Sequence, residues 1–147
     1  MRINAFSDVS LRLLMLLSAT SELQTTRELA ELVDTPYNHV SKAVLRLRQM
    51  GMLVAVRGRS GGVRISDEGL QATVGGVLRL LDDRADVAAC ESDSGDCPLA
   101  HGCGLRGALN QAREAFYASL DTVTIASLAS PRQAGPVPVT LRTRRVG

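Results

Sequence analysis

Three cysteines, Cys90, Cys97 and Cys103, are the residues of this 147-residue chain whose type and spacing best suit metal chemistry. They follow the pattern C-x6-C-x5-C in a stretch rich in Asp, Ser, Gly and Pro, where no periodic apolar pattern would place thiols in a core. Three cysteines cannot all pair with one another, and the first residues, MRINAFSD, do not resemble a secretory signal, so a disulfide framework is the weaker interpretation. The stretch is therefore predicted to bind a metal ion or a metal cluster.

Two rival chemistries use the histidine of the same stretch. The three cysteines with His101 or an acid could form a structural zinc site. Alternatively, Cys97 or Cys103 could act as a nucleophile with His101 as its base, but the sequence offers no oxyanion stabiliser or orienting partner. An enzyme is therefore not expected, whereas zinc stays open as the occupant.

Composition and charge separate the chain into two halves. With 45% hydrophobic and 22% charged residues it fits one globular domain, and its longest nearly uncharged run, Leu13–Ser21, is too short to span a bilayer, so a cytoplasmic protein is expected. Residues 42–64 hold six basic side chains and no acid, whereas residues 82–96 hold six acids and one base. This separation predicts a half that binds a polyanion and a half with a second function.

Two helices are predicted before residue 34. The first covers Asp8–Thr20, where apolar residues recur at helical spacing, and Ser7 is its expected N-cap. The second begins at Thr25, whose hydroxyl forms a capping-box pattern with Glu28. Both helices are followed by polar residues, which are typical of turns.

A third helix is predicted to read DNA. Thr35 is its expected N-cap, Pro36 its first residue and Met50 its last, since Gly51 follows. Two short helices joined by a tight polar turn are typical of a helix-turn-helix, whose last helix enters the major groove. The apolar residues expected to face the core are Val40, Val44 and Leu47. The residues predicted to contact DNA are Tyr37, Asn38, His39, Ser41, Lys42 and Arg46.

A β-hairpin is predicted after this helix. Met52–Val56 and Val63–Ile65 are rich in β-forming residues and flank the glycine-containing segment RGRSGG. Such a hairpin would be the wing of a winged helix-turn-helix. Its predicted contacts with phosphates or a narrow minor groove are Arg57, Arg59 and Arg64.

The second half is predicted to form two further helices around the cysteine stretch. Ser66 is expected to cap a helix over Asp67–Leu81, a longer helix is expected over about Leu105–Leu120, and one more turn over Thr122–Leu128. The longer helix carries an apolar seam formed by Leu105, Leu109, Ala112, Phe116 and Leu120. A small domain cannot cover this seam, so a homodimer is expected. The predicted regions are a winged helix (1–81), a cysteine loop (82–104), a dimerisation region (105–129) and a disordered basic tail (130–147).

Taken together, these features resemble the winged-helix iron–sulfur transcription regulators of the IscR/NsrR family, most of all its actinobacterial nitric-oxide-sensing branch. The resemblance covers residues 1 to about 129, through the segments FSDVSLRLLMLL, TTRELAELVDTPYNHVSKAVLRLRQMG, RGRSGG and EAFYASLD. It implies a mainly α fold with a small β-hairpin wing and a long dimerisation helix. It also implies a repressor that binds a pseudo-palindromic operator in double-stranded DNA as a homodimer.

The resemblance also implies a ligand set. Cys90, Cys97 and Cys103 would bind an iron–sulfur cluster of the 4Fe-4S type, with 2Fe-2S as the alternative. In the nitric-oxide-sensing branch the fourth ligand is an aspartate near the start of the first helix of the other subunit, and Asp8 stands at the matching place. In the IscR type it is a histidine three residues after the last cysteine, a position held here by Arg106, which cannot ligate iron.

Two points bear on this ligand set. The first cysteine interval holds six residues, one more than is usual in the family, and His101 inside the loop is a rival fourth ligand, ranked below Asp8. A carboxylate is a hard ligand, which would leave one iron more exchangeable than soft thiolates do. The resemblance implies that nitric oxide is the signal and that nitrosylation releases DNA.

Overall fold

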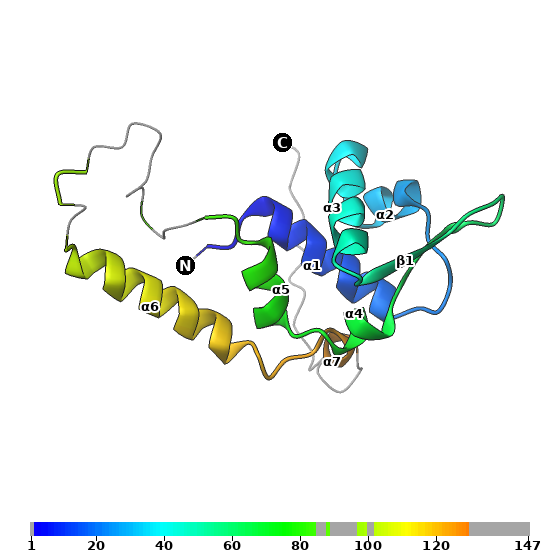
Figure 1. Cartoon of the computed structure of the whole chain (residues 1–147). Coiled ribbons are helices and arrows are strands. Elements are labelled where there is room, and N and C mark those ends of the chain that lie inside the picture. Colours follow the sequence, from blue (N-terminus) through cyan, green and yellow to red (C-terminus); the bar gives the residue numbers. More distant parts are fainter. Residues whose placement is uncertain (1, 85–87, 89–96, 100–101, 130–147) are drawn as a thin grey trace, which may run out of the picture.

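The computed structural model of the chain describes residues 2–84, 88, 97–99 and 102–129, and it is mainly helical (Figure 1). Its elements are α1 (Ala5–Ser18), α2 (Thr26–Leu32), α3 (Tyr37–Gln49), β1 (Leu53–Val56), β2 (Gly62–Ile65), α4 (Asp67–Gln71), α5 (Val74–Leu81), α6 (Gly104–Ser119) and α7 (Ile125–Leu128). The predicted fold class, mainly α with one small hairpin, is therefore confirmed. Cys90, His101 and the predicted tail at 130–147 lie outside the described residues.

Helix α1 begins earlier than predicted. Its N-cap is Asn4, whose Oδ1 accepts a hydrogen bond from the N–H of Ser7 at 2.7 Å. Ser7 lies inside the helix and is 2% exposed, so the prediction of Ser7 as N-cap was wrong. Asn is as good a cap as Ser, and the helix takes the upstream one because Ala5 and Phe6 extend its apolar pattern.

The turn between α2 and α3 is partly as predicted. The capping box at α2 is confirmed, because the N–H of Thr25 donates to Glu28 Oε2 at 2.7 Å and the N–H of Glu28 donates to Thr25 Oγ1 at 3.2 Å. The predicted N-cap of α3 was wrong: Pro36 holds that position, while the Thr35 hydroxyl donates back to the Val33 carbonyl at 3.1 Å. The turn hydroxyl therefore closes α2 instead of opening α3.

The hairpin is tied to the chain ahead of α2. Strands β1 and β2 pair antiparallel, with Leu53 opposite Ile65 and Val56 opposite Gly62. On the outer side of β2, Val63 exchanges two backbone hydrogen bonds with Gln24, at 3.0 and 2.8 Å. This third segment fixes the base of the wing beside the helix-turn-helix.

The predicted single helix over Asp67–Leu81 was wrong, because α4 and α5 are separate. Ser66 caps α4 as predicted, but the backbone is extended at Ala72 and the helix restarts behind a second N-cap, Thr73. At the break, the Ala72 carbonyl accepts the N–H of Ile125 at 2.9 Å. A distant segment therefore takes the hydrogen bond that would have continued the helix.

Helix α1 forms the centre of the core and contacts α3, α5 and α7. Its Leu13 and Leu14 are fully buried, and the predicted inward positions of α3 are buried as expected: Val40, Val44 and Leu47. Among the described helices, none combines the length and the apolar content needed to cross a membrane.

Helix α6 stands beside this core and is joined to it through α5 (Figure 1). Arg79 of α5 donates hydrogen bonds to Glu114 of α6, at 2.6 and 2.9 Å, and to Asp121 just beyond α6, at 2.7 and 2.8 Å. These carboxylates, Asp121 above all, raise the pKa of the guanidinium above its ordinary value. Arg79 also lies 5.7 Å from the ring centre of Tyr117, the one buried residue of α6.

Close packing of α5 on α6 predicts that Gly75→Ala is destabilising. An added Cβ would overlap the Tyr117 carbonyl and the Asp121 carboxylate, so we expect a loss of about 1–3 kcal/mol in the free energy of unfolding, measured by urea denaturation. The control is Gly107→Ala in α6, where an added Cβ meets nothing and helix propensity favours alanine by about 1 kcal/mol. Equal stability of the two variants would contradict this account of the joint.

Candidate nucleic-acid interface and cluster site

The predicted DNA-contacting face of α3 is open to solvent. Tyr37, Asn38, His39, Lys42 and Arg46 are exposed and Ser41 is half-buried, while the opposite side of the helix packs into the core. The helix therefore presents donors and acceptors outward on a rigid support, as major-groove reading requires. That these residues contact DNA stays a prediction.

The wing offers a second basic surface. Arg57 and Arg59 are exposed in its turn, and Arg64 is exposed on β2 between the buried Val63 and Ile65. Within the described part of the chain, no ion pair neutralises any of these three arginines, Lys42 or Arg46. Their charge is therefore available to phosphates.

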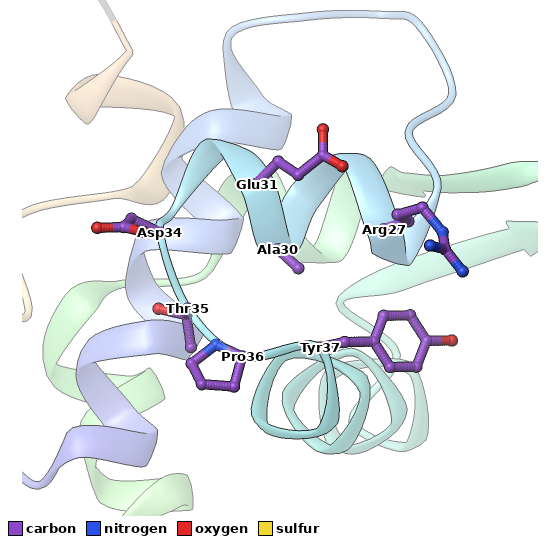
Figure 2. A pocket seen from close by; sticks show the side chains of 7 residues that line it. All are labelled: Arg27, Ala30, Glu31, Asp34, Thr35, Pro36 and Tyr37. Carbon is purple, nitrogen blue, oxygen red and sulfur yellow. The ribbon is translucent and has the colours of Figure 1, made fainter.

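Arg27 is a basic residue of this face that the sequence analysis did not single out. A hollow of about 540 Å³ lies along the helix-turn-helix and is lined by residues from Arg27 to Tyr37. Figure 2 shows the side chains of Arg27 and Tyr37 reaching out at one end of this hollow, whereas Asp34 points away at the other. The signal was weak in sequence because Arg27 stands outside the basic run at 42–64.

A phosphate contact by Arg27 predicts a specific salt effect. Arg27→Gln should weaken binding to operator and random duplex alike and lower the slope of log affinity against log salt by about one. Fluorescence anisotropy over a salt series measures both. Arg48→Gln, at the other end of α3, is the control and should leave the slope unchanged. If the salt slope of Arg27→Gln equals that of the wild type, Arg27 does not contact a DNA phosphate.

Two of the three predicted cysteine ligands are described, and both suit metal binding. Cys97 and Cys103 are free thiols, half-buried. Cys103 is the N-cap of α6, and its side chain makes no capping hydrogen bond. The N–H groups of a first helical turn favour negative charge, so this position suits a thiolate ligand. Cys90 lies outside the described residues.

Asp8 does not gather with Cys97 and Cys103 within one chain. It lies on the first turn of α1, where its carboxylate pairs with Arg12 at 2.7 Å and its side chain is 40% exposed. Among the described residues, no three His, Cys, Asp or Glu side chains gather in a way that could hold a metal ion, so Asp8 does not join Cys97 and Cys103. In Figure 1 the segment 97–99 lies at the left edge of the view, next to the start of α6 and apart from α1.

The start of the cysteine loop is anchored on α6. The Tyr117 hydroxyl donates to Asp82, which is also bound by the guanidinium of Arg84 at 2.7 and 3.1 Å. The hydrogen bonds from Arg84, followed by that from Tyr117, lower the pKa of Asp82 to about 2, against the opposing effect of burial. Since Cys103 caps the same helix, both ends of the loop are held by α6.

This anchor predicts a pH-dependent contribution to stability. A carboxyl whose folded pKa is lowered stabilises the protein above its unfolded pKa and loses that effect as pH falls through the folded value. Asp82→Asn should therefore cost about 2 kcal/mol of unfolding free energy at pH 7, a difference that shrinks as pH falls from about 5 towards 2. The control is Asp83→Asn at the exposed neighbouring residue, which should change the free energy of unfolding little at any pH. A difference independent of pH would contradict the role of the ionised carboxylate.

A helix-turn-helix with an exposed reading helix and a basic wing defines the class of protein: a winged helix-turn-helix transcription regulator that binds DNA. A family model described as Rrf2, iron-dependent transcriptional regulator, matches residues 3–131. The chain belongs to the Rrf2 family, and it is not an enzyme. Both the predicted resemblance and the predicted lack of enzymatic activity are confirmed.

Relatives and solved structures agree with this assignment. The chain is 44% identical to the HTH-type transcriptional repressor NsrR of Streptomyces coelicolor over 151 aligned positions, covering 100% of both chains. It is 32% identical to the HTH-type transcriptional regulator NsrR of Bacillus subtilis, covering 90% and 93% of the two chains. The fold matches that of T. potens IscR with a TM-score of 0.68 and 16% identity, covering 92% of this chain and 93% of that chain. It also matches that of CymR, the global cysteine regulator of B. subtilis, with a TM-score of 0.66 and 21% identity, covering 89% of this chain and 98% of that chain.

Proposed function

We propose that this protein is a homodimeric repressor that senses nitric oxide through an iron–sulfur cluster. Cys90, Cys97 and Cys103 of one subunit and Asp8 of the other would hold the cluster, and nitrosylation would release DNA. The observation that carries the proposal is the match along the whole chain to a repressor named NsrR. Three cysteines and a matching aspartate in this sequence supply the ligands that such a sensor needs.

The apolar seam of α6 supports a dimer. Leu105 is 65% exposed and Ala112 is exposed, while Leu109 and Phe116 are half-buried. Because α6 buries only Tyr117 against its own chain, the seam has apolar surface left for a second copy. Two-fold pairing through α6 would cover it and would place two reading helices on half-sites roughly 34–36 Å apart.

The position of Asp8 supports ligation between subunits. Among the described residues of one chain, the Asp8 carboxylate does not gather with Cys97 and Cys103 and is bound to Arg12, which supports ligation by the loop of a second subunit with exchange of the Arg12 ion pair. When bound, an iron–sulfur cluster supplies iron that reacts with nitric oxide. The protein would hold that iron through the Asp8 carboxylate, a hard ligand that exchanges more readily than a thiolate.

Helix α1 would transmit the state of this site to DNA. Asp8 is on α1, whose buried leucines pack directly against α3, the reading helix. A restraint on α1 from the partner subunit therefore also restrains α3. Since a dimer must match both half-sites at once, a change in the relative setting of the two helices should lower specific affinity more than non-specific affinity.

The ligand set predicts different spectra for two variants. Anaerobically purified Asp8→Ala should have a less stable or differently coordinated cluster and weaker operator binding, whereas Asp8→Cys should retain a cluster. His101→Ala is the control and should keep the wild-type absorbance, Mössbauer spectra and nitric-oxide response. If Asp8→Ala kept the wild-type cluster and His101→Ala lost it, the fourth ligand would be His101 in the loop. A colourless protein with stoichiometric zinc would show that the site binds a structural zinc ion and no cluster.

A further inference from the structure

The described part of the chain leaves an apolar hollow between α1 and α3. Its volume is about 270 Å³, and it is lined by Ala5, Phe6 and Val9 of α1 and by His39 and Lys42 of α3. Phe6, which lines the hollow, is 36% exposed although it is aromatic. This surface is one helical turn or less from Asp8, which lies between Phe6 and Val9 in sequence.

An exposed leucine stands beside the cysteine ligands. Leu99 is 68% exposed, the most exposed of the large hydrophobic residues in the described part of the chain, and it follows Cys97 by two residues. Leu99 is not among the described residues that line the hollow, and the segment 97–99 lies at the N-terminal end of α6, apart from α1 (Figure 1). Within the described part of one chain, the hollow and the exposed Leu99 side chain are therefore separate from each other.

We infer that Leu99 of one subunit docks in the hollow between α1 and α3 of its partner. The inference rests on the proposed function, since a cluster shared by Cys97 and the partner subunit's Asp8 brings segment 97–99 next to the partner's α1. Two residues span at most about 7 Å, so Leu99 lies within that distance of Cys97 and is within reach of the partner's α1. Burial of a leucine side chain in an apolar hollow is favourable.

Charge complementarity favours the same occupant. The loop that carries Leu99 contains Glu91, Asp93 and Asp96 in its sequence, whereas the α3 wall of the hollow carries Lys42 and, beyond it, Arg46. The acidic side chains of a second copy's loop are thus complementary in charge to Lys42 and Arg46, and its Leu99 is complementary to the apolar wall formed by α1.

The docked leucine would link the sensor directly to the reading helix. His39 and Lys42 form one wall of the hollow and also belong to the face predicted to contact DNA. A leucine seated against the stem of Lys42 would hold its ammonium group in place for a phosphate. When the loop loses its metal, Leu99 leaves and this support is lost.

A cross-linking experiment on the holoprotein tests the docking. Two differently tagged chains are expressed together, one carrying Phe6→p-benzoylphenylalanine, and mixed dimers are isolated anaerobically and irradiated. Peptide mapping should join position 6 to the partner's peptide that contains residues 97–99. Cross-links confined to one chain, or to any other peptide of the partner, would overturn the inference.

A pair of leucine variants tests its consequence. Leu99→Asn should weaken operator binding by the holoprotein about tenfold and leave the cluster spectrum and the binding of cluster-free protein unchanged. The control is Leu80→Asn, at a leucine 57% exposed on α5, which should bind as wild type. Equal effects of the two variants would refute the docking. If Asp8→Ala changes the cluster but Leu99→Asn has no effect on operator binding, only the docking of Leu99 is rejected. If the cross-link forms but Asp8→Ala leaves the cluster unchanged, only the assignment of Asp8 as a ligand is rejected.

Discussion

The packing of α1 under α3 is the interaction on which the rest of this structure depends. Leu13, Leu14 and Leu17 are buried to 1% exposure or less, and α3 lies directly against them. The same helix carries Asp8 on its first turn and contacts α5, which leads to the cysteine loop. One buried apolar surface therefore supports the reading helix, the candidate ligand and the connection to α6.

The joint between α5 and α6 is built differently, from charge instead of apolar area. Arg79 holds two carboxylates from α6 and the segment after it, and Asp82 is held by Tyr117 and Arg84. Hydrogen bonds to ionised groups are directional, so they fix the orientation of α6 while burying little surface. The apolar seam of α6 therefore stays largely uncovered by the described part of the chain. The hydrogen bonds of Asp82 with Tyr117 and Arg84 thus fix the position of the first residues of the cysteine loop relative to α6.

The two halves of the chain have complementary needs. In the described part of the chain, the helix-turn-helix and wing present exposed basic side chains on a rigid frame, whereas the second half presents exposed apolar side chains on α6 and the free thiols of Cys97 and Cys103. In the proposed homodimer, a second copy would cover the seam of α6 and the hollow beside the reading helix and would supply Asp8 as the separate ligand. Dimerisation, metal binding and DNA reading would thus depend on the same contacts.

The sequence by itself determined the helix-turn-helix, the hairpin and the inward positions of α3, because capping boxes, glycine turns and helical periodicity are local signals. Family membership also followed from it. Local signals failed at Ser7, where a second good cap lay upstream, and at Ala72, where Ile125 takes the carbonyl that a continuous helix would have used. Only the tertiary structure placed Arg27 beside Tyr37, because the angle of the turn between α2 and α3 decides it, and only the tertiary structure formed the hollow at Val9, because α1 and α3 are distant in the chain.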